Sequence, residues 1–299
     1  MDETARKMDL ARETVRRAVR TAKKGDGEQV ERPDAIVRKL LDRFTTDELR
    51  ALSNGKSINP SQQSRPVVKF IGEEVVIGFA TDTHVGSKFF SDHLWKSFIE
   101  ECKIQNVSRI LFGGDLIEGM SNRPDQIYSL NDVGFSAQMD HAERLLNMTD
   151  IPIYAIDGNH DRWGIKSGGV FAVRDVANRC EHVTFLGHDM ADVEINGTKW
   201  RLWHGEDSSS YATSYRVQKI IEAFPVYSVP DVLLCGHTHK SVVLYERGVC
   251  AISGGALSYQ SDWMRAKRLP NHTGFHIIRA TIRDNQIVRF SPTWYPFYK

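Results

Sequence analysis

The sequence predicts an α/β fold built in layers, on the strength of two observations. Beyond residue 66, short apolar runs rich in β-branched residues alternate with stretches whose apolar residues recur at helical spacing. Polar motifs follow directly after several of these runs, as Asp82 follows the run that ends at Ala80. Open α/β sheets place their functional sites at such strand ends.

The individual elements follow from the same two patterns. Short continuous apolar runs are typical of buried strands. They predict strands near Val75–Ala80, Arg109–Phe112, Ile153–Ile156, Thr184–Leu186, Met190–Ile195, Lys199–Trp203, Val232–Cys235, Ser241–Tyr245, Val249–Ser253 and Gly274–Thr281. Helical spacing predicts helices near Asp92–Ile104, Phe135–Asn147, Gly169–Arg179 and Tyr211–Phe224.

Residues 1–60 differ in character, and we expect them to form a small helical segment before a domain of residues 61–299. The segment carries 14 Lys and Arg against 11 Asp and Glu, although the whole chain has a net charge of only +1. Its beginning resembles a truncated helix-turn-helix module. The residues that would then face DNA phosphates are Arg12, Arg16, Arg17 and Arg20. The alternative is an amphipathic helix with a solvated basic face.

Five polar motifs occur in order along the remaining chain. They are Asp82-Thr83-His84, Gly114-Asp115-Leu116-Ile117-Glu118, Gly158-Asn159-His160-Asp161, His204-Gly205 and Gly236-His237-Thr238-His239. Carboxylate, imidazole and amide groups together suit divalent metals such as manganese, iron or zinc. Any one motif could simply cap a strand end, but five in one chain favour a metal site.

From Val75 to about Thr281, these motifs resemble the signature of the calcineurin-like metallophosphoesterase superfamily. The resemblance implies a sandwich of two sheets flanked by helices. It also implies two metal ions, the first bound by Asp82, His84 and His239 and the second by Asn159, His204 and His237. Asp115 would bridge the two ions. His160 would face the substrate as the general acid, and Glu118 would orient it.

Such a centre implies phosphoester hydrolysis. Two cations about 3.5–4 Å apart neutralise phosphate oxygens and lower the pKa of a shared water, which acts as the nucleophile. His160 would give a proton to the departing alkoxide. We expect Mn²⁺ at both positions, with Fe, Zn, Ni and Mg as alternative ions.

DNA is the expected substrate and partner. The Gly-Gly-Asp-Leu-Ile form of the second motif, with the basic front segment, resembles the DNA-repair exonuclease branch. In the loop Tyr259–Asn271, Trp263 and Arg265 suit base stacking and phosphate contact, or simply local packing. The alternatives are a phosphomonoesterase or small-nucleotide phosphodiesterase, and a DNA-binding or replication-complex component with a secondary metal site.

The composition indicates the cellular compartment of the protein. No apolar stretch is long enough to span a membrane, and no signal peptide opens the chain. The four cysteines show no paired spacing, which predicts reduced core residues. We therefore expect a cytoplasmic protein without membrane association; a homo-oligomer is compatible with the sequence.

Deleting residues 1–60 should weaken DNA binding if the four arginines contact phosphates. The slope of log affinity against log salt should flatten by about 0.7–0.9 for each lost contact. Fluorescence anisotropy with labelled DNA over a salt series measures both effects. Turnover of a small diester should stay unchanged, because the metal ligands begin at Asp82. An unaltered slope would instead support the solvated helix.

Overall fold

The computed structural model describes residues 66–297 except 69, 206–211 and 226–227. The chain divides into two units, and every described residue lies in the second, Arg65–Lys299. The predicted helical segment 1–60 lies outside the described residues, with Arg12, Arg16, Arg17 and Arg20. The boundary near residue 60 therefore stays a prediction.

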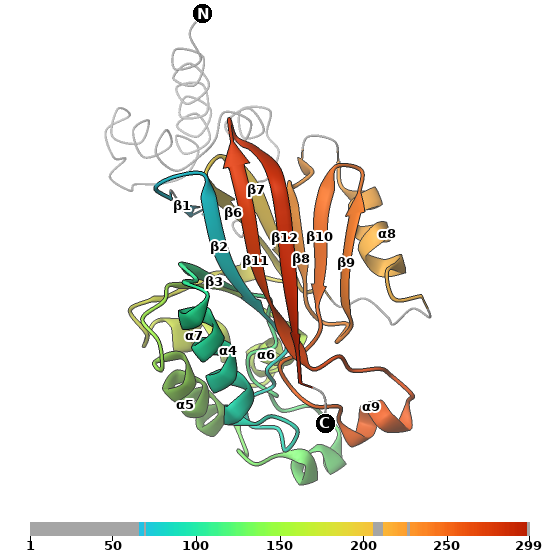
Figure 1. Cartoon of the computed structure of the whole chain (residues 1–299). Coiled ribbons are helices and arrows are strands. Elements are labelled where there is room, and N and C mark those ends of the chain that lie inside the picture. Colours follow the sequence, from blue (N-terminus) through green and yellow to red (C-terminus); the bar gives the residue numbers. More distant parts are fainter. Residues whose placement is uncertain (1–65, 69, 206–211, 226–227, 298–299) are drawn as a thin grey trace, which may run out of the picture. The chain divides into compact units, whose positions relative to one another are not determined.

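Two six-stranded sheets pack face to face (Figure 1), which confirms the predicted α/β sandwich. The first sheet has the order β12-β11-β2-β3-β4-β5. Its strands are β2 (Glu74–Ala80), β3 (Arg109–Phe112), β4 (Ile153–Asp157), β5 (Val183–His188), β11 (Gly274–Arg283) and β12 (Gln286–Pro296). The second sheet has the order β1-β6-β7-β8-β10-β9. Its strands are β1 (Val67–Val68), β6 (Met190–Ile195), β7 (Thr198–Trp203), β8 (Val232–Cys235), β9 (Ser241–Glu246) and β10 (Val249–Gly254).

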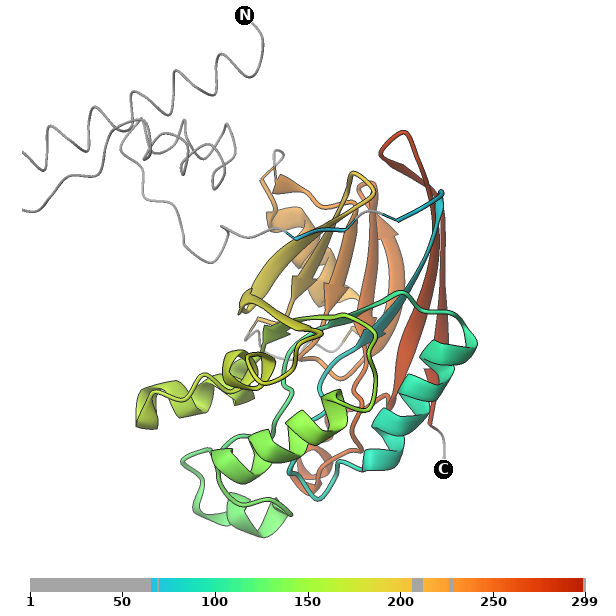
Figure 2. The same cartoon turned by 90° about the vertical axis from the view of Figure 1, so that its left-hand side faces the viewer.

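Helices cover the outer faces of both sheets (Figures 1 and 2). Over the first sheet lie α4 (Asp92–Ile104), α5 (Phe135–Leu146) and α7 (Ala172–Ala177). The outer face of the second sheet packs against α8 (Tyr215–Ala223). Three further elements lie among the loops at one end of the sheets: the 3₁₀ helix η2 (Pro124–Ser129), α6 (Asn159–Gly168) and α9 (Asp262–Ala266).

The central strands are apolar on both faces because each face is covered. In β2, Val75, Ile77 and Phe79 pack between the two sheets, and Ala80 packs toward the helices. β8 follows the same rule, with Leu234 between the sheets and Leu233 beneath α8. Strands buried on both faces need unbroken apolar runs, and such runs are what made these strands recognisable in the sequence.

Among the described residues, five elements were not predicted: β1, η2, α6, α9 and β12. β12 contains Pro292 and Pro296, which the pattern of a central strand excludes; it forms the edge of the first sheet, where a missing N–H is tolerated. α6 begins inside the third polar motif, so its residues were read as a loop. The predicted helix Gly169–Arg179 is shorter, Ala172–Ala177, because Gly169 ends α6 in the left-handed conformation.

The burial of the cysteines and the lengths of the helices can be compared with what the composition predicts. All four cysteines are free; Cys102, Cys180 and Cys235 are buried, as expected of core residues, whereas Cys250 is half-buried. Of the helices in the described ranges, none is both long enough and apolar enough to cross a membrane.

Candidate metal centre

The metal-site motifs meet where parallel strands of the two sheets end. In the first sheet, β2, β3 and β4 run parallel, and Asp82, Asp115 and Asn159 follow them. In the second sheet, β7 and β8 run parallel and precede His204 and His237. Because the carboxyl ends of parallel strands share one edge, all five segments reach the same region.

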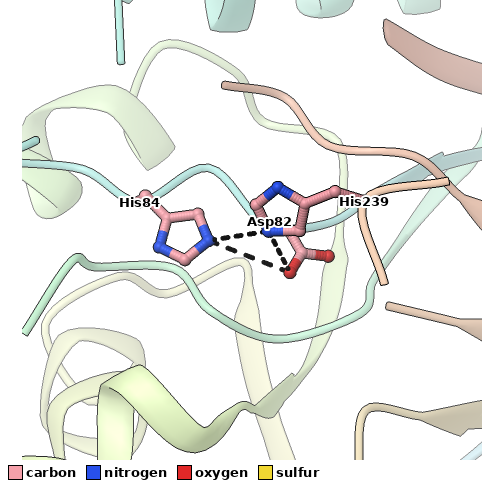
Figure 3. Close-up of side chains that lie close together, drawn as sticks. All are labelled: Asp82, His84 and His239. Carbon is pink, nitrogen blue, oxygen red and sulfur yellow. Dashed lines mark hydrogen bonds and ion pairs between the residues drawn. The ribbon is translucent and has the colours of Figure 1, made fainter. Parts of the chain in front are cut away.

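Asp82, His84 and His239 lie close together and form the first group of candidate metal ligands (Figure 3). Nε2 of His84 lies 3.1 Å from Nε2 of His239. Oδ1 of Asp82 lies 3.2 Å from Nε2 of His239 and 3.9 Å from Nε2 of His84. The other oxygen of Asp82 accepts from the Thr81 hydroxyl at 2.6 Å, which leaves Oδ1 directed at the two imidazoles.

Asp115 lies between this group and a second one. Its Oδ2 is 3.2 Å from Nε2 of His204 and 3.9 Å from Nε2 of His84, so one carboxylate oxygen neighbours both groups. Oδ1 of Asn159 lies 3.2 Å from Nε2 of His204. His237 joins Asp115 and His204 in the second cluster. Two carboxylates, four imidazoles and an amide oxygen fit a pair of borderline divalent cations.

Hydrogen bonds at Nδ1 orient the rings of His204 and His239, with Nε2 toward this centre. Nδ1 of His204 donates to the Gly113 carbonyl at 2.7 Å. Nδ1 of His239 contacts Oδ1 of Asn271 at 2.7 Å, and the Asn271 amide in turn donates to the Ser258 carbonyl. A ring nitrogen that donates away from the site leaves the other as an electron-pair donor, the usual arrangement of a metal-binding histidine.

Five of the seven ligand residues have a left-handed backbone. They are Asp82, His84, Asp115, His237 and His239, with φ between 50° and 71°. This conformation is uncommon for residues other than glycine and persists only where the surroundings hold it. Here the loops after β2 and β3 bond to each other, with Asp82 N to Gly114 O at 2.9 Å and His84 N to Asp115 O at 3.1 Å.

The carboxylates and imidazoles strongly influence each other's charge. Although burial opposes the effect, the charges of His204 and His160 keep the pKa of Asp115 well below its usual range. Burial lowers the pKa values of His84 and His204, but the carboxylates outweigh it. Glu118 raises the pKa of His84 to about 9, and Asp115 raises the pKa of His204 to about 10. A buried site with this negative potential favours cations.

His160 lies beside the ligand cluster and is held from two sides. Its Nδ1 donates to the backbone carbonyl of Glu118 at 2.8 Å, and its ring packs against that of Trp163 with centroids 4.0 Å apart and planes tilted by 32°. The Glu118 carboxylate lies nearer to His84, with Oε2 at 3.0 Å from Nδ1 of His84 and 3.7 Å from that of His160. Glu118 therefore orients His160 through its backbone, whereas the resemblance had assigned that task to its side chain.

Asp161 has a structural role. Its buried carboxylate accepts from the backbone N–H groups of Gly158, Leu116 and Ile117 at 2.9–3.2 Å. These bonds cap the start of α6 and tie it to the loop after β3. They therefore fix His160 relative to Asp115, whose Oδ1 also accepts from the His160 N–H at 2.9 Å.

The centre opens into a cleft of about 780 Å³. Besides ligand residues, its walls include Arg123 near η2, Trp263 and Tyr259 from the loop around α9, and Arg216 and Lys240. The guanidinium of Arg123 lies over the Trp263 ring, 5.2 Å from its centroid. Burial first, and then the charge of Arg216, lower the pKa of Lys240.

The two residues predicted to contact nucleic acid from this loop have different positions. Trp263 is half-exposed and lines the cleft. Arg265 does not belong to the cleft lining; it is exposed and pairs with Asp262 at 2.9 Å. Arg265→Gln therefore serves better as a control for the cleft than as a test of it.

Several residues of the site carried no usable signal in the sequence. Asn271 lies 32 positions from His239, and only the fold joins them. Arg216 and Lys240 looked like ordinary charged residues, and Arg123 like a loop residue. Trp163 had a signal, because it lies three residues after His160, but that spacing becomes informative only once α6 is known to be a helix.

Asp115→Asn should lose most bound metal while the fold survives, because Asp115 neighbours both ligand groups and the amide removes a charge. Metal content after dialysis against Mn²⁺ measures the loss, and circular dichroism measures the fold. Asp175→Asn on the outer helix α7 is the matched control and should keep its metal. Full metal occupancy in Asp115→Asn would refute the bridging assignment.

Comparison with known proteins identifies the family of this chain. Residues 75–267 match the calcineurin-like phosphoesterase superfamily domain. The DNA polymerase II small subunits of Archaeoglobus fulgidus and Methanocaldococcus jannaschii are each 25% identical, over 239 and 288 residues. The matched parts cover 64% and 78% of this chain and 48% and 47% of theirs, so the chain spans about half the length of these curated relatives.

A solved structure described as a novel archaeal phosphodiesterase is 18% identical with a TM-score of 0.44, over 74% of this chain and 100% of that one. Since the matched region covers more than half of the chain and contains every ligand motif, the chain belongs to the calcineurin-like phosphoesterase superfamily.

Proposed function

We propose that this chain hydrolyses phosphodiester bonds of DNA with two divalent cations, Mn²⁺ being the expected ion. The observation that carries the proposal is the convergence of seven candidate ligand side chains and His160 on one cleft. When bound, the ions would neutralise the phosphate oxygens and activate water. Family membership supports the reaction class, and the walls of the cleft support the substrate.

The protein's own groups supply orientation and the proton. Asp115 holds the two ligand groups at a constant separation through Oδ2 and positions the His160 backbone through Oδ1. Because the Nδ1 hydrogen of His160 is engaged by the Glu118 carbonyl, Nε2 is the ring nitrogen left for the substrate. From that position His160 can protonate the leaving oxygen or stabilise its developing charge.

The shape and chemistry of the cleft favour a nucleic acid over an isolated phosphate ester. Its volume of about 780 Å³ exceeds what a single phosphate group fills. Trp263 and Tyr259 offer faces on which bases can stack, and Arg123 offers a positive charge beside them. The name of the curated relatives, DNA polymerase II small subunit, points to the same class of substrate.

That name also favours a second candidate, in which the chain is a DNA-binding component of a replication complex and the metal centre is secondary. A purely structural centre would not require a histidine outside the ligand set. His160 is nevertheless held beside the cluster by the Glu118 carbonyl, the Trp163 ring and the start of α6. This arrangement supports the catalytic candidate.

A substrate panel with Mn²⁺ tests the proposal. We expect cleavage of bis-para-nitrophenyl phosphate and labelled single-stranded DNA, with para-nitrophenyl phosphate a poorer substrate. Asp115→Asn, assayed alongside, identifies contaminating activity, because it should be inactive. Cleavage of the monoester alone would favour a phosphomonoesterase, and DNA binding without any hydrolysis would favour the second candidate.

His160→Ala should keep both metals yet slow cleavage of DNA by about 10²–10⁴-fold, as for other lost acid–base groups. The loss should shrink for bis-para-nitrophenyl phosphate, because para-nitrophenolate leaves without a proton. Metal content and kcat on both substrates decide the outcome. His141→Ala is a matched control, since His141 pairs with Asp92 and Asp132 away from the centre. An equal loss on both substrates would make His160 a contact for phosphate charge instead.

A further inference from the structure

Gln138 is a fully buried glutamine near the start of α5 that belongs neither to the candidate ligands nor to the lining of the cleft. Glutamine is mostly exposed in proteins and needs hydrogen-bond partners when it is buried. The side-chain oxygen of Gln138 accepts from the Gly119 N–H at 2.7 Å. Its side-chain nitrogen donates to the carbonyls of Asp132 at 3.0 Å and Gly119 at 3.3 Å. Because a backbone N–H only donates and a carbonyl only accepts, these partners allow one orientation of the amide.

The N–H that Gln138 binds belongs to the same peptide group as the carbonyl that binds His160. Nδ1 of His160 donates to the Glu118 carbonyl at 2.8 Å, and that carbonyl is joined to the Gly119 nitrogen in one planar unit. In a trans peptide such as this one, the N–H and the C=O point in opposite directions, so fixing the first fixes the second. Hydrogen bonds in a chain also polarise one another, which strengthens the acceptor that His160 contacts.

This peptide group lies between two helices that leave it little room. Gln138 belongs to α5, and its neighbours Met139 and Ala142 pack in the core that covers the first sheet. On the other side is the start of α6, where a Cβ atom at Gly119 would lie only 2.4 Å from the His160 carbonyl oxygen. Gly119 also has a φ of 69°, so the close approach and the backbone conformation both require glycine. The Glu118 carbonyl is therefore a rigid acceptor, and Gln138 ties it to the core.

We infer that Gln138 is a positioning residue for His160, acting through the peptide between Glu118 and Gly119. It holds the carbonyl of that peptide toward the ring, which keeps the imidazole hydrogen on Nδ1 and leaves Nε2 for the substrate. A peptide turned over would present its N–H to His160, and the ring would then carry its hydrogen on Nε2. The inference rests on the proposed function and deepens it, because it names the residue that sets the tautomer of the general acid.

A double-mutant cycle on the full chain with Mn²⁺ tests the inference. Gln138→Met removes the acceptor for the Gly119 N–H and keeps roughly the volume of the side chain. The kcat on labelled single-stranded DNA should fall by about 10- to 100-fold with little change in KM. The loss should shrink on bis-para-nitrophenyl phosphate, as for His160→Ala. In the His160→Ala background, Gln138→Met should cost no further rate, because the group that it positions is gone. A loss of equal size in both backgrounds would overturn the inference, since Gln138 would then act on something other than His160.

The tautomer of His160 is a readout that needs no turnover. ¹⁵N NMR of histidine-labelled protein with diamagnetic Mg²⁺ reports which ring nitrogen carries the hydrogen, and the spectrum of His160→Ala identifies the signals. At a pH where imidazole is neutral, the wild type should carry the hydrogen on Nδ1, and Gln138→Met should move part of the population to Nε2. An unchanged tautomer in folded Gln138→Met would contradict the inference. Hydrogen on Nε2 in the wild type would contradict it even if Gln138→Met does not fold.

Two further variants are controls. Gln138→Glu keeps an oxygen that accepts from the Gly119 N–H, so it should keep the Nδ1 tautomer and most of the rate. Gln105→Met removes a glutamine outside the cleft lining that bonds Glu101 and Arg279, and it should match the wild type. Thermal unfolding of each variant identifies loss of fold as a separate cause. A tautomer that depends on Gln138 in a protein that cleaves no DNA would sink the proposed function and leave the positioning role standing.

Discussion

The carboxylate of Asp115 joins loops that belong to both sheets. Its Oδ2 contacts His204, which follows β7 in the second sheet, and neighbours His84, which follows β2 in the first. Its Oδ1 accepts from the backbone of His160 at the start of α6. These contacts require the two sheets to be in one relative position, which is set by the side chains packed between them, such as Phe79, Trp200 and Leu234. A displacement of about 1 Å at such a site can cost two orders of magnitude in rate, so the inter-sheet core is a condition of the chemistry.

The same dependence explains the strained backbone of the centre. Left-handed conformations cost of order 1–3 kcal/mol at each non-glycine residue, and five ligand residues adopt them. The loops after β2 and β3 are held there by bonds to each other and by strands that are buried on both faces. The strain turns the side chains inward from tight turns, an orientation that an extended strand would not give them.

The walls of the cleft come from other segments than the candidate metal ligands. The candidate ligands follow the strand ends, whereas Arg123 precedes η2, Trp263 lies in α9 and Arg216 lies in α8. One connection between the two is direct: the side-chain amide of Gln126 donates to Glu118 at 3.2 Å and accepts from the Ser121 backbone. The segment that carries Arg123 is thereby tied to the residue beside His84 and His160. Such segments can change while the ligand set stays the same, which is how one fold serves many phosphoesters.

What the sequence determined by itself was local. The unbroken apolar runs identified the buried strands, because a strand covered on both faces has no polar side, and the motifs after them identified the ligand residues. Elements without such a pattern were not predicted. β12 contains prolines, which only an edge strand tolerates, and α6 begins inside a polar motif. Only the tertiary structure decided that Asn271 contacts His239, that Glu118 orients His160 through its carbonyl, and that Arg216 and Lys240 both line the cleft. These relations join residues far apart in the chain, and no spacing in the sequence encodes them; they exist because two packed sheets bring separate strand ends to one place.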